Sequence, residues 1–116
     1  MSEENCLFCR MIAGEIAADV AFRDEHAFVI RDINPQAPTH LLVIPTEHLD
    51  SLDDAAKRHE PVLGHLLRVA ARVANSEGLA EGGYRTVINT GAGAGQSVFH
   101  LHIHVLGGRS LSWPPG

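Results

Sequence analysis

The chain has 116 residues, of which 45% are hydrophobic and 20% are charged, and its formal net charge is −5 at pH 7. This length fits a single domain over residues 1–116, because a chain of this size buries roughly two-thirds of the surface that its unfolded form exposes. The acidic balance, with no run of lysine or arginine, argues against a protein that binds nucleic acid or a membrane surface. A local pocket for a small phosphate remains compatible with it.

The N-terminal segment MSEENCLFCRMIAGE predicts neither a secretory signal nor a membrane anchor. Its acidic residues precede a short apolar run, where a signal peptide would have basic residues and a longer apolar stretch. We therefore expect a cytoplasmic protein. In that compartment Cys6 and Cys9 are reduced thiols or metal ligands rather than a disulfide.

The first half of the chain predicts a short helix followed by three strands. Residues 7–13 form a short apolar run before a glycine, which suits a helix that stops there. Two β-rich runs at 20–24 and 27–32 are separated by two residues, the spacing of a hairpin. After the turn-forming sequence NPQAP, residues 40–45 predict a third strand that ends at a proline.

The second half predicts one long helix and two further strands. Residues 60–78 place apolar side chains on one side at helical spacing, with a proline in the first turn and a glycine at the end. Runs at 84–89 and 98–108 read as strands, joined by the glycine-rich loop 90–97. The order predicts an α+β fold, a five-stranded antiparallel sheet with one long covering helix and a short N-terminal helix.

The run HLHIHVL places histidines at alternate positions, His100, His102 and His104. On a strand they share one face, but the outer two lie about 13 Å apart along it, too far for one zinc ion with bonds of about 2.0–2.1 Å. A merely polar strand face is the plain alternative. Three histidines opposite an apolar face instead favour a catalytic site. A neutral imidazole is a nucleophile near pH 7, and neighbouring imidazoles can hold its tautomer and donate to an anion.

The loop GAGAGQS, directly before these histidines, predicts an anion site. Its glycines let backbone N–H groups turn toward an anion, and Ser97 adds a hydroxyl donor. It differs from a Walker loop, because no GK[ST] follows and it leads into a strand. Most glycine-rich hairpins bind nothing, but this one adjoins three histidines and so indicates a phosphate-binding catalytic centre.

These motifs resemble the histidine triad (HIT) family, in particular the nucleotide-binding branch that hydrolyses purine nucleoside phosphoramidates. The resemblance covers DINPQAPTHLLVIP, GYRTVINTG and GQSVFHLHIHVLGGRSLSWPPG, at residues 32–45, 83–91 and 95–116. It implies a HIT domain whose sheet pairs with that of a second copy, giving ten strands in a homodimer. It also implies cleavage of a P–N bond, as in adenosine 5′-monophosphoramidate, through a covalent nucleotidyl-histidine and with no cofactor required for catalysis.

The resemblance gives catalytic roles to four side chains. His102 corresponds to the nucleophile that attacks the α-phosphorus, and His40 to a histidine that supports it. His104 and Ser97 correspond to groups that hold the phosphate oxygens.

The resemblance also implies a purine nucleotide pocket. Asp32 corresponds to the carboxylate that accepts both ribose hydroxyls, which suits an ionised, acceptor-only group; a polar strand end is the plain alternative. Gly95 and Gln96 correspond to the phosphate cradle, and Asn89 to a residue near the 5′ side of the nucleotide. The apolar base pocket corresponds to positions that would otherwise pass as core, namely Leu7, Phe8, Ile16, Ile30 and Ile33.

Cys6 and Cys9 form a CxxC, which is half of a tetrahedral zinc site. Many members of the nucleotide-binding branch lack these cysteines, so the chain departs from that pattern here. Its likeness to other HIT proteins, especially bacterial ones with CxFC near the start, implies a structural zinc, with His48 and His100 as the remaining ligands. The alternative is a pair of reduced, partly buried thiols.

The C-terminal SLSWPPG predicts an extended tail, because two consecutive prolines fit neither a helix nor a central strand. Trp113 has too much apolar area to suit a freely solvated tail. The resemblance implies that Trp113 and Pro114 reach the partner's active site in the homodimer, and the WPPG ending favours the phosphoramidate branch. Two alternatives stay open, a non-catalytic purine nucleotide-binding module and a dinucleoside polyphosphate hydrolase or nucleotidyl transferase of the same superfamily.

Overall fold

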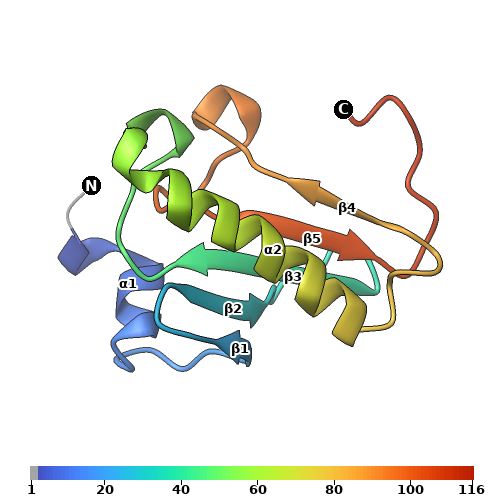
Figure 1. Ribbon diagram of the computed structural model, residues 1–116, viewed down its shortest axis with the longest axis horizontal. Helices are drawn as coiled ribbons and strands as arrows, with labels where there is room; N and C mark the ends of the chain where they lie inside the picture. Colours follow the sequence, from blue (N-terminus) through green and yellow to red (C-terminus); the bar gives the residue numbers. More distant parts are fainter. Residues whose placement is uncertain (1–2) are drawn as a thin grey trace.

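The computed structural model describes residues 3–116, and in it a long helix crosses one face of a single antiparallel sheet (Figure 1). The strands are β1 (Val20–Arg23), β2 (Ala27–Arg31), β3 (Thr39–Pro45), β4 (Tyr84–Val87) and β5 (Ile103–Gly107). The helices are α1 (Leu7–Ile12) and α2 (Glu60–Ser76), with short 3-10 turns at Glu3–Asn5, Leu52–Asp54, Lys57–His59 and Ala92–Ala94. The predicted α+β architecture is confirmed.

The strands lie in the order β1-β2-β3-β5-β4, and each neighbouring pair is antiparallel. In this register Leu42 of β3 lies opposite Ile30 of β2 on one side and opposite His104 of β5 on the other. The central position of β3 therefore brings the end of the histidine run next to residues that are more than sixty positions earlier in the sequence.

The sheet has a different apolar layer on each face, because successive side chains of a strand point to opposite sides. On the α2 face, Val43 and Val105 pack with Leu66, Val69 and Val73 of the helix. On the opposite face, α1 covers a smaller cluster that contains Cys6, Phe8, Phe28, Ile30, Leu42 and Ile44. Because α1 has only six residues, it covers only part of this second face.

The histidine run differs from the predicted strand at its start. Strand β5 begins at Ile103, whereas the sequence predicts strand from residue 98, and residues 98–102 have no regular secondary structure. The reason is a change of hydrogen-bonding partner: Leu101 N–H donates to the carbonyl of Leu49 at 2.7 Å, outside the sheet. The alternation of faces still holds, since Leu101 and Ile103 belong to the α2-side core.

Two other elements end two residues earlier than predicted: α2 ends at Ser76 and β4 ends at Val87. Gly78, with φ of 77°, adopts a left-handed conformation just after α2, as expected of a glycine that ends a helix. Across residues 3–116, the structure contains no helix of the length and hydropathy needed to span a bilayer.

Candidate active site

A cavity of about 210 Å³ opens on the sheet face that α1 partly covers. Its walls come from α1, β2, β3, β5 and the segment that precedes β5. The structure brings together here the predicted site residues Leu7, Phe8, Ile30, Asp32, Ile33, Ser97, His102 and His104. The cavity therefore has an apolar part and a polar part that contains two imidazoles, a carboxylate and a hydroxyl.

Other cavity residues are missing from the sequence-based prediction, namely Met11, Arg31, Leu42 and Val98. Met11 follows Leu7 by four positions on α1, so helical spacing alone could have placed it on the same face. Leu42 depends on the pairing register of three strands, which the sequence does not reveal. It looks like any other core position of a strand.

Some predicted nucleotide-site residues lie outside the cavity walls. Ile16 is half-buried and does not line the cavity. Gln96 is only 4% exposed, and its side chain bonds to backbone groups around it. Asn89 lies beside the glycine-rich loop, since a Cβ added to Gly95 would be 3.9 Å from its Nδ2. These positions suit support of the loop, and their contact with a nucleotide stays a prediction.

His102 presents an unprotonated nitrogen on the cavity side. Its Nδ1 lies 2.7 Å from the carbonyl oxygen of His100, and a carbonyl can only accept, so Nδ1 carries the proton and Nε2 has the lone pair. The ring is buried and packs edge-on against Phe8, with 5.2 Å between centroids. Burial lowers the pKa of His102 below its ordinary value of 6.5. The ring is therefore neutral near pH 7, as a nucleophile requires.

His104 has the opposite tautomer, which follows from two hydrogen bonds in series, from Gln36 to His40 and from His40 to His104. The backbone N–H of Gln36 donates to Nδ1 of His40 at 3.0 Å, so His40 has its proton on Nε2. That nitrogen lies 2.9 Å from Nδ1 of His104, which must accept, and His104 therefore keeps its proton on Nε2. Burial, with the neighbouring imidazoles, lowers the pKa of His104 to about 4. A neutral N–H donor thus borders the cavity next to a neutral nucleophile.

His40 contacts His104, the ring next to His102, through the hydrogen bond at 2.9 Å. Support of the nucleophile by His40 stays a prediction. Burial lowers the pKa of His40, against the opposing effect of the Asp32 carboxylate, whose Oδ2 lies 3.4 Å from His40 Nε2. These three groups are close enough to surround a cation. However, the proton on His40 Nε2 leaves no lone pair there for a metal.

Asp32 directly follows β2, at the polar rim of the cavity. Its Oδ1 accepts a hydrogen bond from the backbone N–H of Asn34 at 2.9 Å, which fixes the turn after the strand. Its other oxygen, Oδ2, lies 3.4 Å from His40 Nε2, and the Asp32 side chain as a whole is 19% exposed. A partly buried carboxylate at this rim can accept hydroxyl donors from a ligand.

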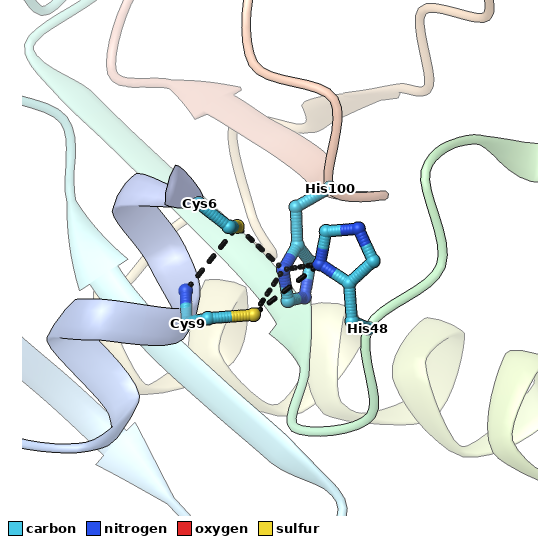
Figure 2. A group of neighbouring side chains, drawn as sticks. All are labelled: Cys6, Cys9, His48 and His100. Atoms are coloured by element: carbon cyan, nitrogen blue, oxygen red, sulfur yellow. Dashed lines mark hydrogen bonds between the residues drawn. The ribbon is translucent and has the colours of Figure 1, made fainter. Parts of the chain in front are cut away.

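A second cluster lies beside the cavity and consists of Cys6, Cys9, His48 and His100 (Figure 2). The Nδ1 atom of His100 is 3.2 Å from Cys6 Sγ, 3.5 Å from Cys9 Sγ and 3.1 Å from His48 Nδ1. Cys9 Sγ is also 3.2 Å from His48 Nδ1. In a tetrahedral zinc site with bonds of about 2.0–2.3 Å, neighbouring ligand atoms are about 3.3–3.8 Å apart. The four groups are close to that arrangement.

The hydrogen bonds of the two cluster histidines point their lone pairs at each other. His100 donates its Nε2–H to the carbonyl of Pro45 at 2.8 Å, and His48 donates its Nε2–H to Asp50 Oδ1 at 2.6 Å. Both Nδ1 atoms are then unprotonated and only 3.1 Å apart, which is repulsive unless a proton or a cation lies between them. Burial lowers the pKa of His100 to about 4, which disfavours a proton there. The chemistry of the donor set therefore fits a metal cation.

Comparison with known proteins supplies the family. The HIT domain family matches residues 13–111. The chain belongs to the HIT family. An uncharacterised HIT-like protein of Synechococcus elongatus is 52% identical to this HIT protein, over 97% of the chain and 98% of its own length. The 14 kDa zinc-binding protein of Zea mays is 49% identical (100% and 91%), and the purine nucleoside phosphoramidase of Escherichia coli K12 is 45% identical (96% and 92%).

Solved structures of HIT proteins share the fold closely. A HIT family hydrolase from Legionella pneumophila Philadelphia 1 superposes with a TM-score of 0.94 at 49% identity, over 97% of this chain and 100% of that one. A Zn-bound histidine triad family protein from Mycobacterium smegmatis has a TM-score of 0.82 at 31% identity, over 97% and 83%. The resemblance found in the sequence motifs is confirmed, and the relatives of this HIT protein include hydrolases.

Proposed function

We propose that this HIT protein hydrolyses the P–N bond of purine nucleoside 5′-phosphoramidates. The observation that carries the proposal is the pair of opposite tautomers at the cavity, a lone pair on His102 Nε2 beside an N–H on His104 Nε2. The two rings are 5.0 Å apart between centroids, which suits simultaneous contact with one phosphoryl group. The E. coli relative named purine nucleoside phosphoramidase supports the choice of substrate.

The reaction follows from these two groups as a double displacement. His102 Nε2 attacks the α-phosphorus and forms a P–N bond while the substrate's P–N bond breaks, and the amine leaves after taking a proton from water. His104 Nε2–H and the Ser97 hydroxyl donate to the phosphate oxygens, where negative charge builds up. Water then attacks the nucleotidyl-histidine and releases the nucleoside monophosphate and the free imidazole.

The nucleotide itself fits the remaining walls. The purine packs among the apolar side chains of Leu7, Phe8 and Ile30, and the ribose hydroxyls donate to Asp32. Ile33, which is 98% exposed, becomes covered when the base is bound. Such apolar exposure at the rim of a cavity is typical of a ligand-binding edge.

The test is turnover of adenosine 5′-monophosphoramidate by the wild-type protein and by His102→Ala. His26→Ala is a matched control, because His26 is an exposed histidine outside the cavity. The proposal requires turnover in the wild type and the control, and none in His102→Ala. Tight binding of AMP without turnover in the wild type would instead favour a nucleotide-binding module, and turnover of dinucleoside polyphosphates alone would favour the other hydrolase branch.

We also propose that the second cluster holds a structural zinc ion, with Cys6, Cys9, His48 and His100 as ligands. Two thiolates and two imidazoles are a donor set typical of zinc, and such sites stabilise folding without taking part in the reaction. The maize zinc-binding relative and the Zn-bound mycobacterial structure support this choice of metal. No cofactor is needed for the displacement at His102. The reduced thiols fit a cytoplasmic location.

A homodimer completes the proposal. Strand β4 lies at the edge of the sheet, and the tail that follows β5 runs past it, because Arg85 of β4 donates to the carbonyl of Ser112 at 2.8 Å. Trp113 at the end of this tail is 80% exposed in the single chain. Pairing of two β4 edges would bury apolar surface of this kind, and Trp113 and Pro114 would contribute to the partner's pocket.

A further inference from the structure

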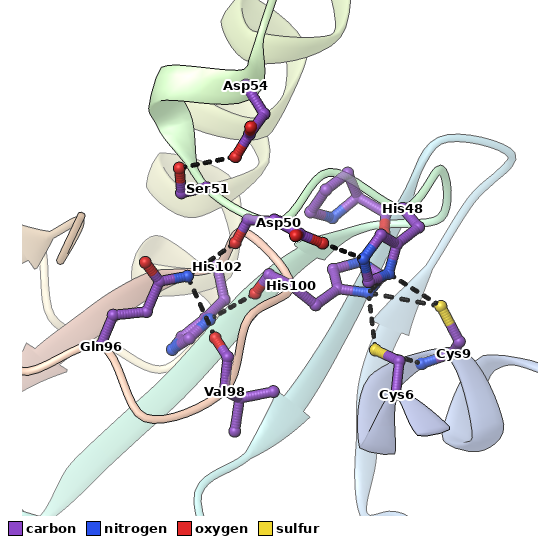
Figure 3. A network of polar contacts seen from close by, with 11 residues as sticks. Cys6, Cys9, His48, Asp50, Ser51, Asp54, Gln96, Val98, His100 and His102 are labelled. Atoms are coloured by element: carbon purple, nitrogen blue, oxygen red, sulfur yellow. Dashed lines mark hydrogen bonds and ion pairs between the residues drawn. The ribbon is translucent and has the colours of Figure 1, made fainter. Parts of the chain in front are cut away.

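Three consecutive residues, His48 to Asp50, connect the metal-binding cluster with the segment that carries the histidine run. Figure 3 shows the first and the third of them beside that segment. The ring of His48 belongs to the cluster, the carbonyl of Leu49 accepts from Leu101 N–H at 2.7 Å, and the carbonyl of Asp50 accepts from Gln96 Nε2 at 2.7 Å. A displacement of this segment would therefore act on the cluster and on both ends of the segment before β5.

The Asp50 carboxylate holds His48 in the orientation that a metal requires. Its Oδ1 accepts the Nε2–H of His48 at 2.6 Å, and that hydrogen bond is the main cause of its lowered pKa. With the proton fixed on Nε2, the lone pair of Nδ1 points at Cys9 and His100. Carboxylates that orient a ligating imidazole in this way commonly raise metal affinity about 10- to 100-fold.

Gln96 links the same segment to the loop that contains Ser97. Besides the carbonyl of Asp50, its amide nitrogen donates to the carbonyl of Val98 at 3.1 Å, and its Oε1 accepts from Gly91 N–H at 2.8 Å. The side chain is 4% exposed, so these bonds replace contacts with water. Ser97 is thus held between two residues whose positions depend on the Asp50 backbone.

His100 contacts both the cluster and the nucleophile, the cluster through its ring and His102 through its backbone carbonyl. Its ring is fixed within the cluster and by the carbonyl of Pro45, and the residue is 0% exposed. Its own carbonyl accepts the Nδ1–H of His102, which is the bond that leaves Nε2 unprotonated. A shift of His100 would therefore lengthen this bond and free His102 to exchange tautomers.

We propose that Asp50 is a positioning residue for the reaction. It orders His48 for the metal, and the filled cluster holds His100, whose carbonyl keeps His102 in its reactive tautomer. The proposal rests on the phosphoramidase function for its kinetic consequence only, because the effects on metal affinity and on the His102 tautomer do not require turnover. Misplacement of a reacting group by about 1 Å can cost about a hundredfold in rate, so this support is large enough to be measured.

The experiment compares Asp50→Ala and Asp50→Asn with Asp53→Ala, which removes the same charge from an exposed position three residues away. Solutions contain buffered free zinc at a level that just saturates the wild type. We expect the Asp50 variants to bind zinc about 10- to 100-fold more weakly and the Asp53 variant to match the wild type. We expect kcat of Asp50→Ala to fall about tenfold with KM within about twofold, and excess zinc to restore most of kcat. Because bound zinc also adds to folding free energy, the kinetics are measured at a temperature at which thermal unfolding shows each variant to be folded, so that rescue by zinc reports on the site and not on refolding.

Nitrogen NMR of the histidine rings gives a readout that is independent of turnover. At the same free zinc, His102 in the wild type should show one tautomer, protonated on Nδ1, and His102 in Asp50→Ala should show a mixture. Unchanged zinc affinity in Asp50→Ala would overturn the proposal, and so would loss of zinc with an unchanged His102 spectrum. A wild type that binds zinc but turns over no phosphoramidate would contradict the proposed function alone, and the zinc and NMR results would still decide the role of Asp50.

Discussion

Two parts of the same histidine run face different groups of side chains. His100 points Nδ1 at two sulfurs and a second imidazole, while its Nε2–H is held by a carbonyl. His102, two residues later, points Nε2 toward the cavity, while its Nδ1–H is held by a carbonyl. One residue type therefore offers opposite nitrogens, and in each case a backbone carbonyl determines which nitrogen is available.

The three neighbouring imidazoles can stay neutral without competing for one ligand, because they present different nitrogens to different surroundings. Burial lowers the pKa of all three, to about 4 for His100 and His104. Each ring then needs a hydrogen-bond acceptor or donor for its second nitrogen, and the backbone, His40 and the cluster supply these partners. In the proposed scheme, local bonding thus separates a metal ligand from a nucleophile and from a phosphate donor.

The largest expected effect concerns the cavity side of this comparison. His102→Ala should reduce kcat at least about a thousandfold, because His104, the other imidazole of the cavity wall, offers an N–H and not a lone pair, and should leave AMP affinity within about tenfold, because the donors and Asp32 remain. His104→Ala should weaken both AMP binding and kcat. Steady-state kinetics and calorimetry on both variants check this. A His102→Ala protein that kept about a tenth of the wild-type rate would exclude His102 as the nucleophile.

The next effect concerns the cluster side. Purified protein should contain about one zinc per chain, and Cys9→Ser should lose that zinc and melt at a lower temperature, since metal binding adds to folding free energy. Elemental analysis and thermal unfolding on the same sample measure both quantities. Ser97→Ala is a suitable control, because Ser97 lines the cavity and is not one of the four proposed metal ligands. It should keep its zinc. Protein from zinc-supplemented medium that contained no metal would mean that the two cysteines are only thiols.

A smaller effect is expected from the tail. Truncation after Leu111 removes Trp113 and Pro114, and it should change the ranking of amine leaving groups more than it changes AMP affinity. The nucleotide walls lie in the chain's own cavity, whereas the tail leads away along β4. A panel of phosphoramidates and light scattering test this prediction. A monomeric wild type would contradict it, as would an unchanged selectivity profile after truncation.

The smallest effect is a shift in the pH profile. Because burial lowers the pKa of His102 below 6.5, the neutral nucleophile should persist as the pH falls below that of ordinary histidine titration. The acid limb of kcat/KM should therefore report an apparent pKa below 6.5. The unfolded chain binds more protons than the native one between pH 6.5 and about 4, so stability should also decrease as the pH falls through this range. An acid limb at 6.5 or above would contradict the inferred burial effect.

The sequence predicts the succession of helices and strands along the chain, because apolar periodicity and the glycine and proline positions mark these elements directly. It also indicated the alternation of faces in the histidine run. It did not predict that regular strand starts only at Ile103, because the bond from Leu101 to Leu49 connects segments that are distant in the sequence. Bridging contacts of this kind have no local signal.

The site was predictable to the extent that it lies in contiguous motifs. The predicted pocket residues Asp32, Ser97 and Phe8 lie together in the structure. Leu42 also lines the cavity, because of the strand register, and the predicted residue Ile16 does not. The hydrogen-bond partner of His40 could not be predicted from the sequence, since only the β3–β5 pairing puts its ring against His104. Tautomers, finally, depend on which hydrogen-bond donor or acceptor lies within bonding distance, and that is a property of the fold.

Nitrogen NMR on protein labelled at its histidine rings tests the central claim most directly, since each ring nitrogen reports whether it carries the proton. At neutral pH, wild-type His102 should be protonated on Nδ1, and His100 and His104 on Nε2, with all three rings neutral. A His102 ring protonated on Nε2 would contradict the account, because the nitrogen that faces the cavity would then have no lone pair with which to attack phosphorus.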